Sequence, residues 1–224
     1  MKKILIFFLL LFFTNLFSQD LKDFVVPKGY KKIVEIKGDL DKDGIDEYVF
    51  VFNTTKEIKS DFENGYKREF FILKKINKKF KIWQHNNSIL FADKTGFSPE
   101  YNSLPEFKIK NGILEITQIF DTNSRHTQTY KDKFRFQNND FYLIGSEHHF
   151  DDTCSFNFSE EINFSTGKII VNQTFQKCFD DENEPVEKDF NQVFFHNFKP
   201  IKMNNFKVGD NLIKIPKTKQ YFHF

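Results

Sequence analysis

The stretch Cys154-Ser155-Phe156-Asn157-Phe158-Ser159-Glu160-Glu161-Ile162-Asn163-Phe164 alternates between apolar and polar residues. Its even positions are apolar except for Glu160, and its odd positions are polar. Because successive side chains of a β-strand point to opposite faces, this alternation predicts a strand with one buried and one solvated face. The chain then turns at 165–168, and apolar residues at the odd positions 169, 171 and 175 predict the returning strand.

The register of this hairpin bears on the two cysteines of the chain. Placing apolar residues opposite one another predicts three facing pairs: Phe164 with Ile169, Ile162 with Val171, and Phe158 with Phe175. Under this register Cys154 and Cys178 are one residue out of alignment. A β-bulge near 172–174 would bring them together in a disulfide. Without it, the thiols point to opposite faces and stay free.

Similar alternation, with turn signals between the segments, continues along the chain. It predicts a mainly β protein with few or no helices, a single domain over 19–224 built of antiparallel hairpins as a sandwich-like or partial-propeller sheet structure. Asn111-Gly112 is the strongest hairpin turn, since a type I′ turn needs positive φ at both central residues. Further strands are expected at 30–36, 47–52, 68–76, 80–84, 106–110, 113–120, 127–137, 141–146, 190–198 and 206–215, and loops at 54–66, 85–104 and 179–188.

The N-terminus predicts export. Met1-Lys2-Lys3 is positively charged, 4–13 is an unbroken apolar run, and small Ser18 precedes the expected cleavage point. The run is shorter than the roughly 20 residues that span a bilayer, so 1–18 is interpreted as a cleaved signal peptide. No later run is longer, so we expect no transmembrane segment in the mature chain. The protein is then periplasmic or extracellular, and an oxidising compartment favours the Cys154–Cys178 disulfide over free thiols.

The charge of the mature chain excludes some partners. Loss of Lys2 and Lys3 leaves 31 Lys and Arg against 31 Asp and Glu. A neutral chain argues against nucleic acid or an anionic membrane as the main partner, because both require a basic surface.

The strongest chemical signal is the acidic stretch Gly38-Asp39-Leu40-Asp41-Lys42-Asp43-Gly44-Ile45-Asp46-Glu47-Tyr48-Val49-Phe50. Counted from Asp39, carboxylates fall at positions 1, 3, 5 and 9, and glycine stands at position 6, where the chain must bend. Calcium accepts six to eight oxygen ligands in flexible geometry. The expected ligands are Asp39, Asp41, Asp43, the backbone carbonyl of Ile45, whose side chain would enter the core, and Glu47.

Two alternatives stay open for this loop. It is not an EF-hand, since position 12 is Phe50 rather than a bidentate glutamate and strands are expected on both sides. Asp46 could replace Glu47 as a ligand. The loop could also be a solvated turn without an ion, because Asp and Gly form turns unaided. Magnesium is less suited, because it keeps several waters and takes few carboxylates.

The segment 39–47, followed by an apolar strand, resembles the calcium loop of FG-GAP or VCBS-type repeats, which occur in integrin-like propellers and bacterial exported proteins. The segments 26–30 and 134–145 resemble exported bacterial (Bacteroidetes-like) proteins of unknown function that carry one such loop. This resemblance implies a calcium-binding role for Asp39, Asp41, Asp43, Ile45 and Glu47. Propellers repeat the loop in every blade, whereas here it occurs once, which favours a smaller sheet structure.

A weaker cluster lies at 147–152. On a strand, Glu147, His149 and Asp151 would share one face and could hold zinc, although a solvated strand edge is the more ordinary interpretation. The sequence as a whole predicts an exported, calcium-stabilised, non-enzymatic binding or surface module with an envelope protein or glycan as partner. The alternative is a secreted or periplasmic hydrolase with acids near His148-His149 or in 85–104; no catalytic residue is assigned.

Overall fold

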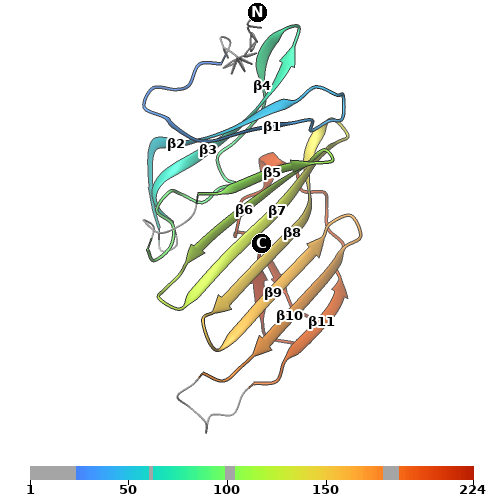
Figure 1. Cartoon of the computed structure of the whole chain (residues 1–224). Coiled ribbons are helices and arrows are strands. Elements are labelled where there is room, and N and C mark those ends of the chain that lie inside the picture. The colour runs from blue at the N-terminus through green and yellow to red at the C-terminus, as the bar shows by residue number, and fades with distance from the viewer. Residues whose placement is uncertain (1–23, 61–62, 99–103, 179–186) are drawn as a thin grey trace, which may run out of the picture.

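The computed structural model describes residues 24–60, 63–98, 104–178 and 187–224, in which antiparallel strands form three sheets (Figure 1). The predicted mainly β class is therefore confirmed. Within these residues the one helical element is a 3-10 turn, η1 (Met203–Asn205), and no helix has the length and apolar character needed to cross a membrane. The predicted signal peptide, 1–18, lies outside the described residues, as does most of the expected loop at 179–188.

The first sheet contains four strands in chain order: β1 (Lys31–Gly38), β2 (Glu47–Lys59), β3 (Asn64–Ile76) and β4 (Lys79–Asn86). The loop predicted at 54–66 is wrong, because β2 and β3 continue through most of it and pair Glu57 with Tyr66. The outer part of this hairpin is largely exposed and polar, so no apolar alternation distinguishes it from a loop. The irregular stretch 85–104 forms no strand after Asn86 where it is described.

The large sheet is a meander of seven strands: β5 (Glu106–Lys110), β6 (Ile113–Asp121), β7 (His126–Gln137), β8 (Asp140–Asp152), β9 (Phe156–Asn163), β10 (Lys168–Phe175) and β11 (Phe190–Phe195). The turn predicted at Asn111-Gly112 is confirmed, with φ angles of 55° and 73°. Asn138 and Asn139 have φ angles of 49° and 63° and close the β7–β8 hairpin in the same way. Local turn chemistry thus fixes these two hairpins.

The register predicted for β9 and β10 is wrong by two residues, although the faces are as expected. Ile162 lies opposite Ile169, and Phe156 lies opposite Phe175. Phe164 leaves the ladder and packs against the rings of Phe198 and Phe224, at centroid distances of 4.6 Å and 5.4 Å. The turn geometry and this packing, rather than the matching of apolar residues, therefore set the register.

The corrected register still leaves Cys154 and Cys178 one residue out of alignment, but neither cysteine is part of the ladder. The β9–β10 ladder runs without a register shift, so the bulge proposed near 172–174 is absent. Cys154 and Cys178 lie beyond the ends of the two strands, and the structure joins them by a disulfide.

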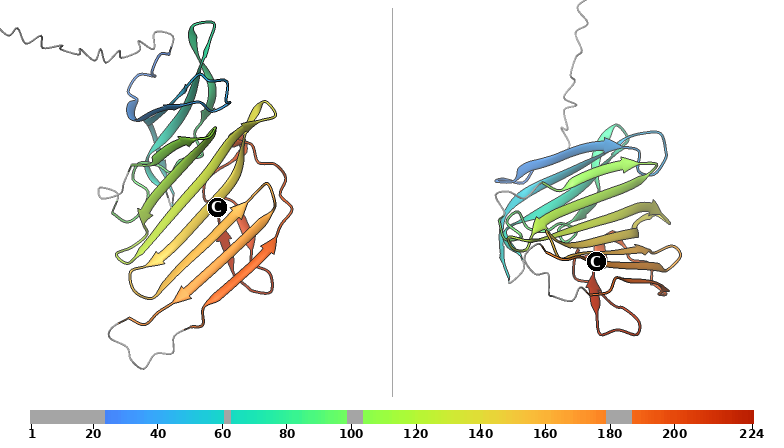
Figure 2. Two further views of the ribbon diagram at one scale, coloured as in Figure 1. Left: turned by 45° about the vertical axis from the view of Figure 1, so that its right-hand side comes forward. Right: turned by 60° about the horizontal axis from the view of Figure 1, so that its bottom comes forward.

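A third, two-stranded sheet pairs β12 (Leu212–Lys214) with β13 (Tyr221–His223). The strand predicted at 206–215 is therefore wrong for its first half. Phe206 and Val208 alternate as in a strand, but both are buried in the core without a strand partner. This C-terminal segment lies along one face of the large sheet (Figure 2).

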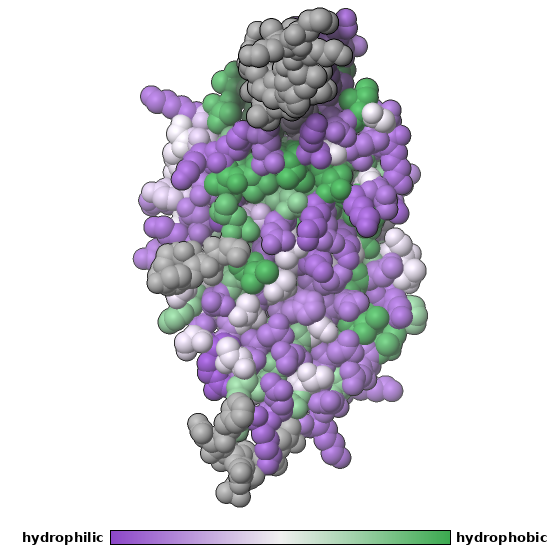
Figure 3. Space-filling view, in the orientation of Figure 1, coloured by the Kyte–Doolittle hydropathy of each residue, from purple (hydrophilic) through white to green (hydrophobic). Residues whose placement is uncertain are grey.

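One hydrophobic core joins the three sheets. It includes Val49 and Phe70 of the first sheet, Leu114 of the large sheet and Phe222 of the C-terminal hairpin. The first and large sheets meet where β1 lies beside β5, and a band of apolar residues is visible at that level (Figure 3). The contact is close, because a Cβ added to Gly38 would lie 2.7 Å from a side-chain carbon of Ile109.

Gly167 offers a test of the β9–β10 turn. Its φ of +72° is left-handed, and an added Cβ would lie 2.3 Å from the carbonyl oxygen of His196, whose N–H donates to the Gly167 carbonyl. We predict that Gly167→Ala lowers the free energy of unfolding by about 1–3 kcal/mol. Gly145→Ala is the matched control, since its Cβ would have ordinary contacts, the nearest at 3.5 Å. Equal urea-unfolding midpoints for the two variants would contradict this turn geometry.

Candidate functional site

The acidic loop closes the hairpin between β1 and β2, since Gly38 pairs with Glu47. The Asp39 carboxylate accepts hydrogen bonds from the backbone N–H groups of Lys42 and Gly44, at 2.6 Å and 2.9 Å. Asp43 accepts one from the Ile45 N–H at 2.9 Å. Gly44 has a φ of +85°, the bend expected at position 6. The acidic side chains thus organise the backbone of their own loop.

The structure brings the carboxylates of this loop together. Ligand oxygens of Asp39, Asp41 and Asp43 lie within 4.8 Å of one another. The ammonium group of Lys74, on β3, contacts Asp41 and lies 2.8 Å from Asp43 Oδ2 and 3.4 Å from Glu47 Oε1. These three carboxylates therefore converge on one position that a cation occupies.

Sequence reasoning missed Lys74. Its signal lies in strand pairing: β3 places Leu73 opposite Tyr48, so the next residue of β3 reaches the level of Glu47 and the loop. The sequence alone does not give that register. Lys74 also lies over the ring of Trp83 on β4, with Nζ 4.9 Å from the ring centroid.

The site combines burial with charge. Glu47 is fully buried, and its Oε2 accepts a hydrogen bond from the Leu40 N–H at 2.8 Å. Burial, together with the charge of Asp41, raises the pKa of Glu47. Burial lowers the pKa of Lys74, but its hydrogen bonds with Asp41 and Asp43 and the charge of Glu47 raise it overall. Lys74 is therefore held in its charged form.

Two expectations for the loop need correction or refinement. Ile45 is 51% exposed and does not enter the core; the apolar residue of the loop that does so is Leu40, which is 1% exposed. Glu47 lies outside the three-carboxylate group of Asp39, Asp41 and Asp43, and reaches the same position through Lys74. Strand geometry explains both: Glu47 begins β2 and faces inward, whereas Ile45 stands in the loop before it.

The zinc interpretation of 147–152 finds no support among the described residues, where the one group with metal-ligand spacing is that of the acidic loop. Glu147 instead forms ion pairs with Lys131, at 2.7 Å, and Lys133, at 2.5 Å. These lysines lower its pKa against the opposing effect of burial.

The opposite face of the same strands forms a cavity. Two cross-strand rows provide its floor: Gln128, Phe150, Phe158 and Gln173 in one, and Tyr130, His148 and Glu160 in the other. The C-terminal segment completes the lining with Gly209, Asp210, Gln220, Tyr221, Phe222 and His223. The cavity has a volume of about 610 Å³. It gathers residues from four neighbouring strands and from a hairpin distant in sequence.

A buried histidine–carboxylate pair lies in this floor. His148 Nδ1 is 3.1 Å from Glu160 Oε2, and its ring lies 4.6 Å from that of Tyr130. In the part of the chain that is described, His148 Nε2 is buried without a hydrogen-bond partner. Burial and the charges of Asp132 and Glu160 raise the pKa of Tyr130, so its phenol stays neutral and donates to Gln128 Oε1 at 2.9 Å.

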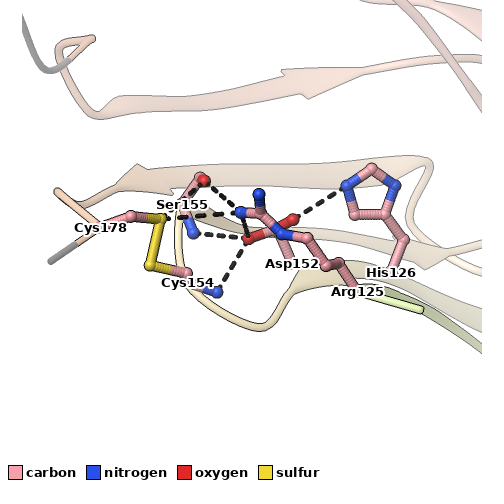
Figure 4. Close-up of a disulfide and its surroundings, with 6 residues drawn as sticks. All are labelled: Arg125, His126, Asp152, Cys154, Ser155 and Cys178. Carbon is pink, nitrogen blue, oxygen red and sulfur yellow. Dashed lines mark hydrogen bonds and ion pairs between the residues drawn. A yellow bond between two sulfur atoms is a disulfide. The ribbon is translucent and has the colours of Figure 1, made fainter. Parts of the chain in front are cut away.

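The disulfide lies at the end of these strands (Figure 4). Beside it, Asp152 accepts hydrogen bonds from the backbone N–H groups of Cys154 and Ser155, at 2.8 Å and 2.7 Å. Arg125 lies 2.7 Å from Asp152 Oδ1, and His126 lies 2.9 Å from Oδ2. Although burial opposes it, Arg125 and the backbone N–H groups of Ser155 and Cys154 lower the pKa of Asp152. This network fixes the turn that carries Cys154.

Comparisons of the chain with models of protein families, with curated proteins and with solved structures found no match. The acidic loop and the cavity are therefore the features of the chain that bear on its function.

Asp132 gives a pH-dependent test of the sheet beneath the cavity. It is 2% exposed and accepts a hydrogen bond from Ser146 Oγ at 2.8 Å. Burial raises its pKa to about 7, against the lowering effect of Ser146 and above the ordinary value of about 3.9. Between these pH values the folded chain holds a proton that the unfolded chain has released, so stability falls as pH rises from about 4 to 7.

We predict that Asp132→Asn removes this pH-dependent loss. The variant should gain stability relative to the wild type by on the order of a few kcal/mol as pH rises from 4 to 7, with no further change above about 8. Urea unfolding at a series of pH values measures it. Parallel pH profiles for the two proteins would contradict the burial of an ionisable Asp132.

Proposed function

We propose that this chain is an exported, non-enzymatic binding module of the bacterial envelope or cell surface, clamped by calcium at its acidic loop. One observation carries the proposal: Asp41, Asp43 and Glu47 converge on a single cation position. Asp39 adds a fourth carboxylate within 4.8 Å of Asp41 and Asp43, so the negative charge of this group exceeds the one positive charge of Lys74. A divalent cation would balance that excess better than Lys74 alone. Export rests on the signal peptide expected from the sequence.

The donor atoms of the loop fit a calcium ion. Asp41 Oδ1 is buried without a hydrogen-bond partner in the described residues, and Glu47 Oε1 is buried with no partner beyond the long ion pair with Lys74 at 3.4 Å. A buried acceptor left unsatisfied costs about 1–3 kcal/mol, and more if it is charged. Carboxylate and carbonyl oxygens are the ligands that calcium prefers. Calcium held by Asp39, Asp41, Asp43, Glu47 and the Ile45 carbonyl would coordinate both of these oxygens.

Lys74 acts in this proposal as a tethered competitor for the calcium position. Without calcium, its ammonium group neutralises part of the loop and preserves the fold. When calcium binds, the group withdraws, and the nearby face of Trp83 can stabilise it there through a cation–π contact. The clamp is therefore a stabilising device, and its removal should cost stability rather than chemistry.

The binding role is favoured over the hydrolase alternative by the composition of the cavity. The hydrolase has one supporting observation, the His148–Glu160 pair. A histidine–acid pair activates a nucleophile within hydrogen-bond reach. The described residues that line the cavity include no serine, threonine or cysteine. A concave, mostly apolar and aromatic lining with a few polar groups is typical of a ligand site. An envelope protein or a glycan stays the proposed biological partner.

Calcium should stabilise the wild-type mature chain against heat. At a free calcium concentration one hundred times the dissociation constant, we predict about 2.7 kcal/mol of added stability, or an increase in melting temperature on the order of 5–10 °C, measured against a chelator. Asp43→Asn should abolish most of this increase. Asp46→Asn is the matched control, because Asp46 lies in the same loop outside the carboxylate cluster and pairs loosely with Lys37 at 3.9 Å. An unchanged wild-type melting temperature would contradict the clamp.

The variant Lys74→Met distinguishes the effect of the Lys74 ammonium group from that of calcium. In chelator the variant should melt below the wild type, because the carboxylates lose the ammonium group that neutralises part of their charge. In calcium it should be stabilised more than the wild type, with several-fold higher calcium affinity, because the competitor is gone. Calorimetric titration measures the affinity. If calcium changed the melting temperature of neither protein, Lys74 would be the permanent counter-ion of the loop and the proposed clamp would be wrong.

A further inference from the structure

We infer that the cavity between the large sheet and the C-terminal hairpin binds a small aromatic ligand that is neutral or positively charged and donates hydrogen bonds. The inference rests on the proposed binding function, but not on the calcium clamp. Four observations carry it: the size of the cavity, its aromatic walls, its unsatisfied acceptors and the sign of its charge.

The size and walls suit a small ring system. A volume of about 610 Å³ falls within the range of roughly 300–1,000 Å³ typical of small-molecule sites. Phe150 and Phe158 line the floor and Tyr221 and Phe222 line the opposite side. Aromatic rings pair in offset-stacked or edge-to-face arrangements that exceed their burial energy by about 0.5–1.5 kcal/mol. A planar aromatic ligand can make such contacts from both sides.

The floor also contains polar groups that the protein does not satisfy. Gln173 is 5% exposed, and within the described chain its side chain takes part in no hydrogen bond. Glu160 uses Oε2 for His148, and no hydrogen bond within the described chain occupies its Oε1. The neighbouring inward residues Ile162, Ile169 and Val171 are apolar. Buried polar groups are costly unless they are hydrogen-bonded, so their place in an apolar face indicates a polar partner. The free oxygen of Glu160 requires a donor, and the amide of Gln173 can pair with either a donor or an acceptor.

The charge of the cavity selects against anions. Its described lining contains the carboxylates of Glu160 and Asp210 and no lysine or arginine. Asp210 is neutralised by Lys207, 2.8 Å away, which leaves Glu160 as the deep negative group. An aromatic carboxylate would meet Glu160 with no lysine or arginine in the described lining to compensate its charge. An amine would gain both an ion pair with Glu160 and contacts with aromatic faces.

The test uses the full mature chain and matched aromatic fragments. Each set carries an amine, a primary amide or a carboxylate on the same ring, as in benzylamine, benzamide and benzoate, and tryptamine, indole-3-acetamide and indole-3-acetate. Binding is measured by ligand-observed NMR and by calorimetric titration. We expect the amines and amides to bind and the carboxylates to be excluded.

Three variants locate the site. Glu160→Gln should weaken amine binding about tenfold, equivalent to about 1.4 kcal/mol, and change amide binding little. Gln173→Ala should weaken both. Asn172→Ala is the matched control, since Asn172 adjoins Gln173 on the same strand, points to the opposite face and bonds to Ser159. Gln173→Ala also serves if Glu160→Gln fails to fold.

The outcomes separate this inference from the proposed function. It is overturned if no fragment binds, if carboxylates bind better than amines, or if Gln173→Ala leaves binding unchanged. Turnover of an aromatic ester by the wild type, lost in Glu160→Gln, would overturn the non-enzymatic function and support the aromatic ligand class. A failure of calcium to stabilise the chain would overturn the clamp, and the fragment result would still decide the inference.

Discussion

Neutralisation of the buried Glu47 is the constraint on which the arrangement of the first sheet depends. Glu47 begins β2, which pairs with both β1 and β3, and it is fully buried. An uncompensated buried charge costs several kcal/mol, so the Leu40 N–H and the Lys74 ammonium group must reach it together. The loop that supplies Leu40 also lies against Gly112, where an added Cβ would be 3.3 Å from the Leu40 carbonyl. The same charge thus links the acidic loop, β3 and the edge of the large sheet.

The fold class and most hairpins follow from local signals. Period-two alternation and the left-handed turn at Asn111-Gly112 require no long-range information. The β9–β10 register requires long-range information, because Phe164 leaves its ladder to pack against residues more than thirty positions later in the chain. The strand expected at 206–215 fails for a similar reason: Phe206 and Val208 bury their side chains without a strand partner. Apolar alternation indicates burial, but it does not identify what each residue packs against.

The two candidate sites also contain features that are predictable from local sequence and features that depend on long-range pairing. The acids of the loop are close in sequence, so their clustering is predictable, whereas Lys74 is brought to them by the β2–β3 register from 33 residues away. The cavity combines four strands with a distant hairpin, and no local motif describes it. Its sequence signals are two polar residues on apolar faces: Glu160, the single break in the apolar face of 154–164, and Gln173 among the apolar odd positions of 169–175. A polar residue that interrupts a buried face indicates a partner, which at the acidic loop is a cation and in the cavity is proposed to be a ligand.

The central claim, that the carboxylates around Glu47 form a site for a metal cation, can be tested with terbium, which takes oxygen ligands as calcium does. Trp83, the only tryptophan, lies 4.9 Å from the ammonium nitrogen that marks the cation position. Energy transfer from this ring should therefore sensitise bound terbium. The account predicts terbium emission on tryptophan excitation that is displaced by calcium and strongly reduced in Trp83→Phe. Absent emission, or emission that calcium does not displace, would contradict it.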